Sequence, residues 1–187
     1  MTIQDIITQR IERGIVMEMI ALLRGVTPTG KNRIPKMSDL VSILSNWGFN
    51  NVRTYIQSGN IILNSSLSRK ATSIEIHNLI LEYIGADLAV IIKSKAQINR
   101  AIKLIPFKEG YDQDRVHLVF TNDKIVEESI ESTQFLDEEL SVGKECFYLY
   151  LPKDARKKKL NTVYLERRFG IVATMRKLNV MNRLRSL

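Results

Sequence analysis

At residues 52–63 the chain reads VRTYIQSGNIIL. Apolar and β-branched residues on both sides of Gln57-Ser58-Gly59 predict two strands, 52–56 and 60–63, joined by a tight turn. Serine, glycine and asparagine suit such a turn because they accept left-handed backbone angles or bond to nearby amides. This hairpin is the centre of the first predicted folding unit.

Along the sequence, a strand and a helix are predicted before the hairpin, and a helix and a strand after it. Ser38 is predicted to cap the first helix and Gly48 to stop it, with apolar positions at Leu40, Val41, Ile43, Leu44 and Trp47. Gly85 is predicted to end the second helix, whose apolar positions are Ile76, Leu79, Ile80, Tyr83 and Ile84. Apolar runs at 19–23 and 88–92 predict buried strands, so the element order is βαββαβ.

The same order recurs after a linking helix around 98–105 that Pro106 ends. We expect a strand at 116–120, a short helix containing Ile125, Val126 and Ile130, and a hairpin formed by 140–142 and 146–151. A basic helix at 157–169, a strand at 171–175 and a last helix containing Leu178, Met181 and Leu184 follow. The pattern predicts an α+β fold of two tandem ferredoxin-like units, 19–94 and 95–187, preceded by an N-terminal extension at 1–18.

Two strands of the first unit have apolar residues on both faces. In the runs 19–23 and 88–92 neither alternate set of positions is polar. A two-layer unit normally buries one face of its sheet, so the second face also needs a cover. We expect the two sheets to pack on each other, with a homodimer partner as the alternative.

The positive charge is concentrated at the C-terminal end. The 187 residues carry a net charge of +8, while Lys153–Leu187 alone holds eleven Lys or Arg against two Asp or Glu. The preceding segment 105–145 is acidic, with eleven Asp or Glu against four Lys or Arg. The basic segment can attract phosphates, pair with the acidic segment, or simply be solvated.

Other features exclude several function classes. No apolar run approaches the roughly eighteen residues that span a bilayer, so no membrane partner is expected. The single cysteine, Cys146, allows no internal disulfide and fits a cytoplasmic location. His77 and His117 have no metal ligands at suitable spacing, and no nucleophile has an evident base. We therefore assign no catalytic residue, metal or cofactor.

A glycine-containing loop follows the first strand. Residues 25–32 read GVTPTGKN, one residue short of a phosphate-binding P-loop. Asn32 replaces the Ser or Thr that would hold magnesium, and Pro35 opposes a helix starting at Lys31. Nucleotide hydrolysis is therefore not indicated, but Arg24, Lys31 and Arg33 can form an anion-binding concavity with the loop amides.

The hairpin turn is a second candidate site. Its amides and hydroxyls can orient a small polar ligand if the turn and the glycine loop lie at the same end of the first sheet. The alternative is that these residues only form turns. The candidate ligand-binding residues are Arg24, Gly25, Gly30, Lys31, Asn32, Tyr55, Gln57, Ser58, Gly59, Asn60 and Arg176.

Aromatic and basic residues of the second unit form a candidate nucleic-acid surface. His117, Tyr148 and Tyr150 are expected to share one sheet face close to the basic helix, where their rings can stack on bases. The alternative is that this face packs against the first unit. The candidates are His117, Tyr148, Tyr150, Lys157, Lys158, Lys159, Arg167 and Arg168.

Several stretches resemble a bacterial family, domain-of-unknown-function family sixteen-ninety-seven. LLRGVTPTGKNRIP at 22–35 and TYIQSGN at 54–60 are similar to the family's LRGINVGGKNKI and TYIQSGNV. Lys159-Leu160, Leu165-Glu166-Arg167 and the stretch 169–174 resemble its C-terminal pattern, but Lys177-Leu178 replaces the family's Asn-Trp pair. The resemblance implies tandem ferredoxin-like units and no established activity.

Three functions are consistent with these patterns. The first is a cytoplasmic protein that binds an anionic partner, either nucleic acid or a phosphorylated metabolite, through the glycine loop and the basic segment. The second is a small-molecule enzyme with a site between the loops at 24–32 and 55–60. The third is a dimeric structural or interaction protein.

Overall fold

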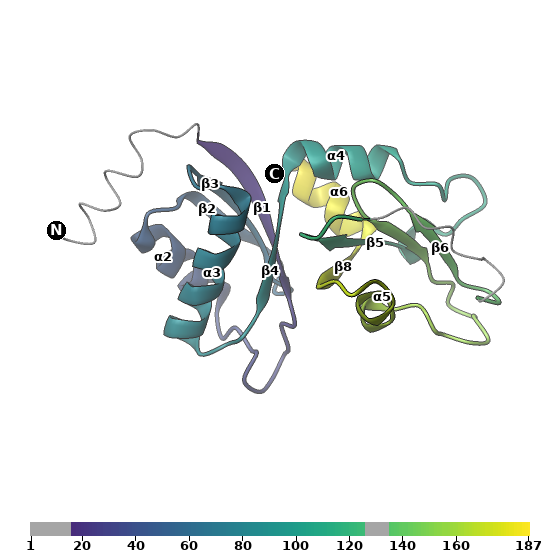
Figure 1. Cartoon of the computed structure of the whole chain (residues 1–187), viewed down its shortest axis with the longest axis horizontal. Helices are drawn as coiled ribbons and strands as arrows, with labels where there is room; N and C mark the ends of the chain where they lie inside the picture. The colour runs from purple at the N-terminus through teal and green to yellow at the C-terminus, as the bar shows by residue number, and fades with distance from the viewer. Residues whose placement is uncertain (1–15, 126–134) are drawn as a thin grey trace. The chain divides into compact units, whose positions relative to one another are not determined.

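The computed structural model describes residues 16–125 and 135–187 (Figure 1). The chain divides between Ser94 and Lys95 into two compact units. Each unit contains a four-stranded antiparallel sheet, with helices between strands. The predicted α+β fold with two tandem ferredoxin-like units is therefore confirmed.

The first unit has the strand order β2-β3-β1-β4, and every neighbouring pair is antiparallel. Figure 1 shows α2 and α3 on one face of this sheet. The elements are β1 (Met17–Arg24), α2 (Met37–Trp47), β2 (Asn50–Tyr55), β3 (Asn60–Ser65), α3 (Arg69–Ile84) and β4 (Ala89–Ser94).

Alternation along β1 distributes its apolar residues over both faces of the sheet. Met19, Ala21 and Leu23 belong to the buried cluster that also contains α2 and α3 residues. The opposite face carries Ile20 and Leu22, which pair with Ile62 and Ile91 of the neighbouring strands. Both faces are apolar, and the expected cover of the second face, by the other unit or by a second copy, stays a prediction.

The glycine stops of α2 and α3 are confirmed, but the predicted start of α2 is wrong. Gly48 and Gly85 adopt left-handed angles, φ 118° and 78°, and their N–H groups satisfy carbonyls of the last turn. Lys36, in an extended conformation, is the N-cap of α2, and Ser38 lies inside the first turn. The Ser38 hydroxyl faces the Asp39 carboxylate at 3.4 Å instead of a helix amide, because the helix begins one residue before it.

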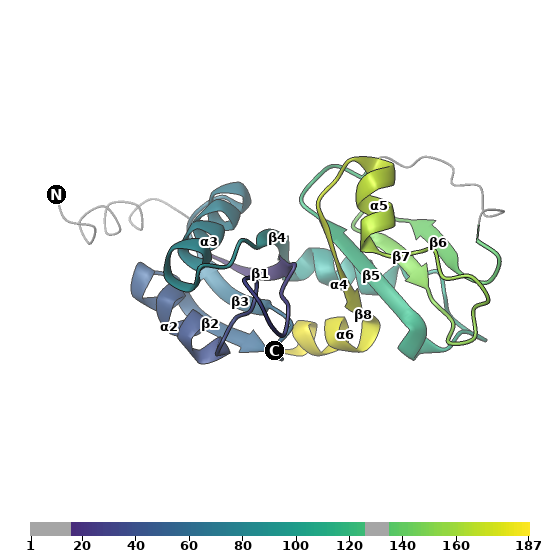
Figure 2. The ribbon, with the colours of Figure 1, turned by 90° about the horizontal axis from the view of Figure 1, so that it is seen from below.

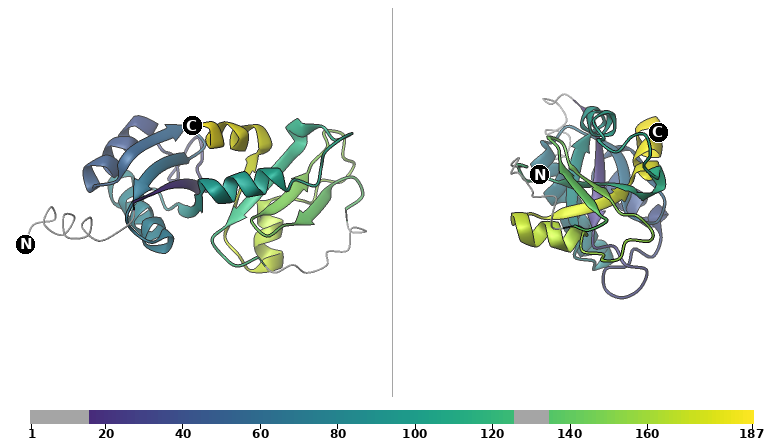
Figure 3. Two further views of the ribbon diagram at one scale, coloured as in Figure 1. Left: turned by 90° about the horizontal axis from the view of Figure 1, so that it is seen from above. Right: turned by 90° about the vertical axis from the view of Figure 1, so that its right-hand side faces the viewer.

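The second unit repeats the strand order, as β6-β7-β5-β8. Figures 2 and 3 show α5 on one face of this sheet and α4 and α6 on the other. The elements are α4 (Lys95–Lys103), a 3-10 turn (Gln113–Arg115), β5 (Val116–Thr121), β6 (Glu139–Val142), β7 (Phe147–Tyr150), α5 (Thr162–Phe169), β8 (Ala173–Lys177) and α6 (Leu178–Ser186).

The core beneath α5 is built from the inward positions of three strands. Val119, Phe147 and Ala173 are buried there against Leu165 of the helix. On the opposite face of the sheet, the Tyr148 hydroxyl donates to the Ala101 carbonyl of α4 at 2.9 Å. Both faces of this sheet are therefore covered by elements of its own unit.

Two predicted boundaries in the second unit are wrong, and one element cannot be compared. The basic helix begins at Thr162 rather than Lys157, because side chains from another segment bind the backbone of 156–160, as described below. The last strand occupies Ala173–Lys177 rather than 171–175. The predicted short helix with Val126 and Ile130 lies outside the described residues.

Candidate anion-binding sites

The two loops singled out in the first unit lie side by side. Asn60, the first residue of β3, pairs with Leu22 of β1 on one side and with Tyr55 of β2 on the other. The Leu23 amide donates to the Gly59 carbonyl at 2.8 Å. The loop after β1 and the turn before β3 therefore share one end of the sheet. We call residues 24–33 and 55–60 the first-unit rim.

Gly59 is the point of closest approach within the rim. A Cβ atom at this position would lie 2.7 Å from Leu23 Cβ and 3.0 Å from Val26 Cγ2. Its φ of 75° is also in the left-handed region, which disfavours residues with a side chain. Glycine is required here by both the backbone angle and the packing.

The asparagines of the rim make hydrogen bonds within the first unit. Asn60 is fully buried, and its Nδ2 donates to the Tyr55 carbonyl and to Ser58 Oγ, each at 3.0 Å. Asn32 Oδ1 accepts from the Asp87 amide at 3.3 Å, and its carbonyl accepts from the Thr27 amide at 3.1 Å. These groups close the turns and join the glycine loop to the segment before β4.

Fewer rim side chains are available to a ligand than the sequence predicts. Lys31 and Gln57 are exposed, and no residue in the described part of the chain bonds to either side chain. Ile56 is also exposed and has a φ of 49°, which is unfavourable for a β-branched residue. A binding role for Lys31 and Gln57 stays a prediction.

Arg176, the proposed complement to the rim, belongs to β8 of the second unit. It is buried, and its guanidinium donates to Thr174 Oγ1 at 2.7 Å and to the Met175 carbonyl at 2.9 Å. Burial lowers the pKa of Arg176 to about 10, so the side chain remains charged at neutral pH. Its role towards a ligand stays a prediction.

The predicted aromatic face of the second unit is wrong. Opposite residues of antiparallel strands share a face, and β5 pairs Leu118 with Tyr148 and His117 with Leu149. His117 therefore lies on the α5 side of the sheet, while Tyr148 and Tyr150 lie on the α4 side. The register between β5 and β7, which the sequence alone does not fix, separates the three rings.

The surroundings of His117, Tyr148 and Tyr150 also show that the three rings do not form a shared surface for stacking bases. Tyr148 is buried, and burial is the main reason why its pKa is raised. Tyr150 packs edge-on against Tyr111, with ring centroids 4.8 Å apart. His117 Nδ1 lies 2.9 Å from the Arg115 carbonyl, and desolvation lowers its pKa. These residues stabilise the unit from within.

Acidic residues before β6 fix the basic loop that precedes α5. Arg156 donates from Nε and Nη2 to the two Asp137 carboxylate oxygens, at 3.1 and 2.8 Å. The buried Glu138 carboxylate accepts from the amides of Lys159 and Leu160, at 2.6 and 2.8 Å. Asp137 and Arg156 reinforce each other's charged form, which lowers the pKa of the first and raises that of the second.

This arrangement leaves most of the basic side chains exposed. Glu138 uses its charge on backbone amides, so it anchors the loop without neutralising the lysines. Across residues 16–125 and 135–187, no carboxylate forms an ion pair with Lys157, Lys158, Lys159 or Arg167. Of the run 156–159, only Arg156 has an acidic partner there.

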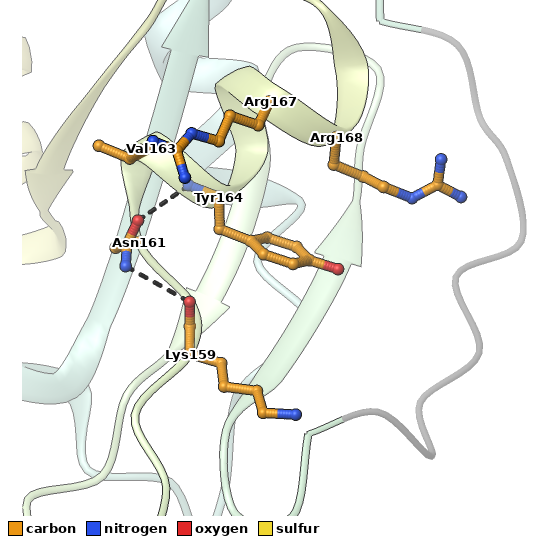
Figure 4. A pocket seen from close by; sticks show the side chains of 6 residues that line it. All are labelled: Lys159, Asn161, Val163, Tyr164, Arg167 and Arg168. Carbon is orange, nitrogen blue, oxygen red and sulfur yellow. Dashed lines mark hydrogen bonds between the residues drawn. The ribbon is translucent and has the colours of Figure 1, made fainter.

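A pocket of about 520 Å³ opens beside the first turn of α5 (Figure 4). None of its lining residues is acidic: Lys159, Asn161, Val163, Tyr164, Arg167 and Arg168. Asn161 is the N-cap of α5, because its Oδ1 accepts from the Tyr164 amide at 2.9 Å. We call this the α5 pocket.

Side chains of different chemistry line the α5 pocket together. Figure 4 shows Tyr164, Lys159 and Arg168 extending to the same side, while Arg167 turns back along the helix towards Val163. Tyr164 meets Phe135 edge to face, with ring centroids 5.5 Å apart, so the core fixes the position of its ring. The lining combines three cations, one aromatic ring and one exposed aliphatic side chain.

The sequence identified the cations of this pocket but missed its other members. Lys159, Arg167 and Arg168 were candidates, whereas Asn161, Val163 and Tyr164 were not. A signal for them was present, because Asn161 is a good helix N-cap and a cap there places Tyr164 in the first turn. A helix that starts at Lys157 would place Asn161 in its interior, so the prediction did not treat Asn161 as an N-cap.

Two kinds of site are absent from the described residues, 16–125 and 135–187. No group of three His, Cys, Asp or Glu side chains in them could hold a metal ion. None of their helices has the length and apolar character needed to cross a bilayer.

The fold and the signature stretches define a protein of two tandem ferredoxin-like units. The model of the family described as "Protein of unknown function (DUF1697)" matches residues 17–148. The chain belongs to this family, and the resemblance seen in the sequence is confirmed. The matched range ends before the α5 pocket begins.

A solved structure agrees with this fold. The conserved bacterial protein SP0830 from Streptococcus pneumoniae is similar over 92% of this chain and 98% of its own, with a TM-score of 0.70 and 20% sequence identity. At this identity the likeness concerns the fold alone. No curated protein sequence matches the chain.

Proposed function

We propose that the protein binds an anionic, phosphate-bearing partner through the basic surface of its second unit, centred on the α5 pocket. The observation that carries this proposal is a pocket lined by three cations and no acid. Lys157 and Lys158 extend the same surface along the loop that leads to the pocket. Clustered cations without carboxylates attract phosphate groups and accelerate their encounter with the protein.

Two features favour phosphate over an incidental solvated surface. The loop that carries Lys159 is anchored by the buried Glu138, so the cation is attached to ordered backbone. The first turn of α5 also contributes its partial positive charge on the same side as the lysine. An ordered cationic concavity needs less rearrangement to bind an anion than a flexible charged tail does.

The test is a titration with inorganic pyrophosphate followed by amide chemical shifts of the full chain. We expect the amides of Lys159, Asn161, Arg167 and Arg168 to shift together with one dissociation constant. A variant with Lys159→Glu and Arg167→Glu is expected to lose the shifts. The matched control, Lys103→Glu with Arg183→Glu, changes the net charge equally but lies on α4 and α6, across the sheet, and is expected to keep them.

Equal loss in both charge-reversed variants would mean that net charge alone attracts the anion, and the proposed site would be wrong. Shifts spread over both faces of the second unit would contradict it as well. Pyrophosphate serves as a probe here because it carries phosphate charge without a base or a sugar.

The first-unit rim supports a second candidate, a site for a small polar molecule. The observation that favours it is the contact between the glycine loop and the hairpin turn at Gly59. A panel of metabolites is expected to contain a compound that raises the thermal unfolding midpoint, and Lys31→Ala and Gln57→Ala are expected to abolish that rise. A rise that survives both substitutions would locate the compound elsewhere.

A further inference from the structure

We propose that the partner of the α5 pocket is single-stranded nucleic acid, with a base stacked on Tyr164 and the phosphates on the surrounding cations. This inference rests on the proposed function and specifies its ligand. It depends on two observations, the composition of the pocket lining and the number of exposed cations around it.

The lining is suited to a base as well as to phosphate. Tyr164 is half-buried and its ring is held against Phe135, while Val163 beside it is 44% exposed. A site for inorganic phosphate alone has no use for an aromatic ring and an aliphatic side chain. A nucleobase does, because its faces are apolar and stack on aromatic rings.

The cations are more numerous than a single nucleotide requires. Lys159, Arg167 and Arg168 line the pocket, and Lys157 and Lys158 precede it on non-helical backbone. Consecutive Cα atoms lie about 3.8 Å apart, so the three lysines follow one another along a path instead of converging on one point. Such a path matches the repeating phosphates of a strand.

A single strand fits this surface better than a duplex does. The bases of a duplex are stacked on one another and cannot reach a tyrosine beside a helix without being flipped out. Bases of a single strand are available for stacking, and stacking tolerates any base because each has a π face. We therefore expect little sequence preference and a clear preference for the unpaired strand.

The experiment measures fluorescence anisotropy of the full-length protein with four labelled probes. These are an oligothymidylate of about twelve nucleotides, its duplex, an abasic strand with the same number of phosphates, and thymidine monophosphate. We expect the oligothymidylate to bind at least about fivefold more tightly than each of the other three. Between about 50 and 200 mM salt, its affinity should fall about 20- to 130-fold if three to five phosphates are contacted.

Two variants separate stacking from charge. Tyr164→Leu is expected to weaken oligothymidylate binding at least about fivefold and to leave the abasic strand unaffected. Tyr164→Phe keeps the ring and is expected to bind both probes as the wild type does. Because Tyr164 also packs on the core, the thermal unfolding midpoint of each variant shows whether the fold is retained, and Tyr164→Phe keeps the inference testable if Tyr164→Leu fails to fold.

The outcomes distinguish this inference from the function on which it rests. Equal affinity for the abasic strand, the duplex or the mononucleotide would overturn the single-strand inference, while pyrophosphate binding at the α5 pocket would still stand. Unchanged oligothymidylate affinity in a folded Tyr164→Leu would also overturn it. Absence of every interaction, including pyrophosphate, would overturn both.

Discussion

The first-unit rim and the α5 pocket are both polar, but they use their polar groups differently. In the rim, the side chains of Asn32 and Asn60 bind backbone groups of the same unit. In the pocket, three cations and a tyrosine ring share the lining, and the nearby acid Glu138 binds backbone amides rather than the cations. The asparagine side chains of the rim therefore stabilise the fold, whereas the cationic side chains of the α5 pocket are exposed.

This difference shows that a stretch of sequence can match a family pattern because it forms a turn, without being a binding site. The rim residues match the family pattern most closely, and the structure gives several of them clear structural roles. A side chain that is required by a turn is under constraint whether or not a ligand exists. A cluster of like charges in a pocket that no acidic residue lines has no comparable value for stability, since like charges repel. The pocket is therefore the better candidate for binding.

Gly59→Ala tests the structural role of the rim and should have the largest effect. The added methyl group would approach Leu23 Cβ to 2.7 Å, and alanine would have to adopt a φ of 75°. The left-handed backbone costs about 1–2 kcal/mol and the overpacking about 1–3 kcal/mol. We expect the free energy of unfolding, measured in urea, to fall by about 3–4 kcal/mol.

Gly30→Ala is the matched control. Its φ of 80° is similar, but nothing lies within 4 Å of the added Cβ atom. The expected loss is the backbone cost alone, about 1–2 kcal/mol. Equal losses for the two variants would show that close packing at Gly59 does not stabilise the rim.

Glu138→Ala tests the anchoring of the basic loop. The substitution removes a buried carboxylate that accepts two amides, and the Leu160 amide is itself buried. Hydrogen bonds to a charged group contribute about 1.5–3 kcal/mol, so we expect the free energy of unfolding to fall by about 2–3 kcal/mol. Amide hydrogen exchange at Lys159 and Leu160 should accelerate more than at Leu165.

The exposed acid Asp154 provides the control for that prediction. Asp154→Ala removes the same charge from the neighbouring loop and is expected to change the free energy of unfolding by less than about 0.5 kcal/mol. If Glu138→Ala were equally mild, the loop before α5 would be held by other contacts.

The fold was predictable because its elements follow local rules. Apolar periodicity placed the strands, and Gly48, Gly85 and Gly170 adopt the left-handed angles that end the three helices before them. The start of α5 was predicted too early. Asn161 marks it as an N-cap, but the sequence does not show that the distant Glu138 carboxylate binds the loop before it. Local patterns contain no information about such a partner.

The candidate site was only partly predictable for a related reason. The basic character of 157–168 is visible in the sequence, but which face each side chain occupies depends on strand register and on the helix start. His117 shows this, because its pairing with Leu149 places it on the face opposite Tyr148. A shift of one residue between β5 and β7 would reverse that result.

Ile56→Asn tests whether the rim contains strain, and we expect a gain in stability. Ile56 has a φ of 49° and is 48% exposed, so its replacement removes little buried surface. Asparagine tolerates the left-handed region better than a β-branched residue, and the expected gain is about 1 kcal/mol in urea unfolding. Ile56→Val keeps the branched Cβ and should give no gain. An equal gain for valine would mean that side-chain exposure, rather than backbone angle, is the cause.

The dependence of stability on pH should be the smallest effect, and it concerns His117. Desolvation lowers the pKa of His117 in the folded protein, with additional repulsion from Lys177 and Arg115, below the ordinary value of 6.5. The unfolded chain therefore binds a proton more readily than the folded one as the pH falls through 6.5, and stability decreases in that direction. Glutamine has no such titration, so His117→Gln should reduce the loss of unfolding free energy between neutral and mildly acidic pH. If wild type and variant lost stability equally over that range, the buried histidine would contribute nothing to the acid sensitivity of the second unit.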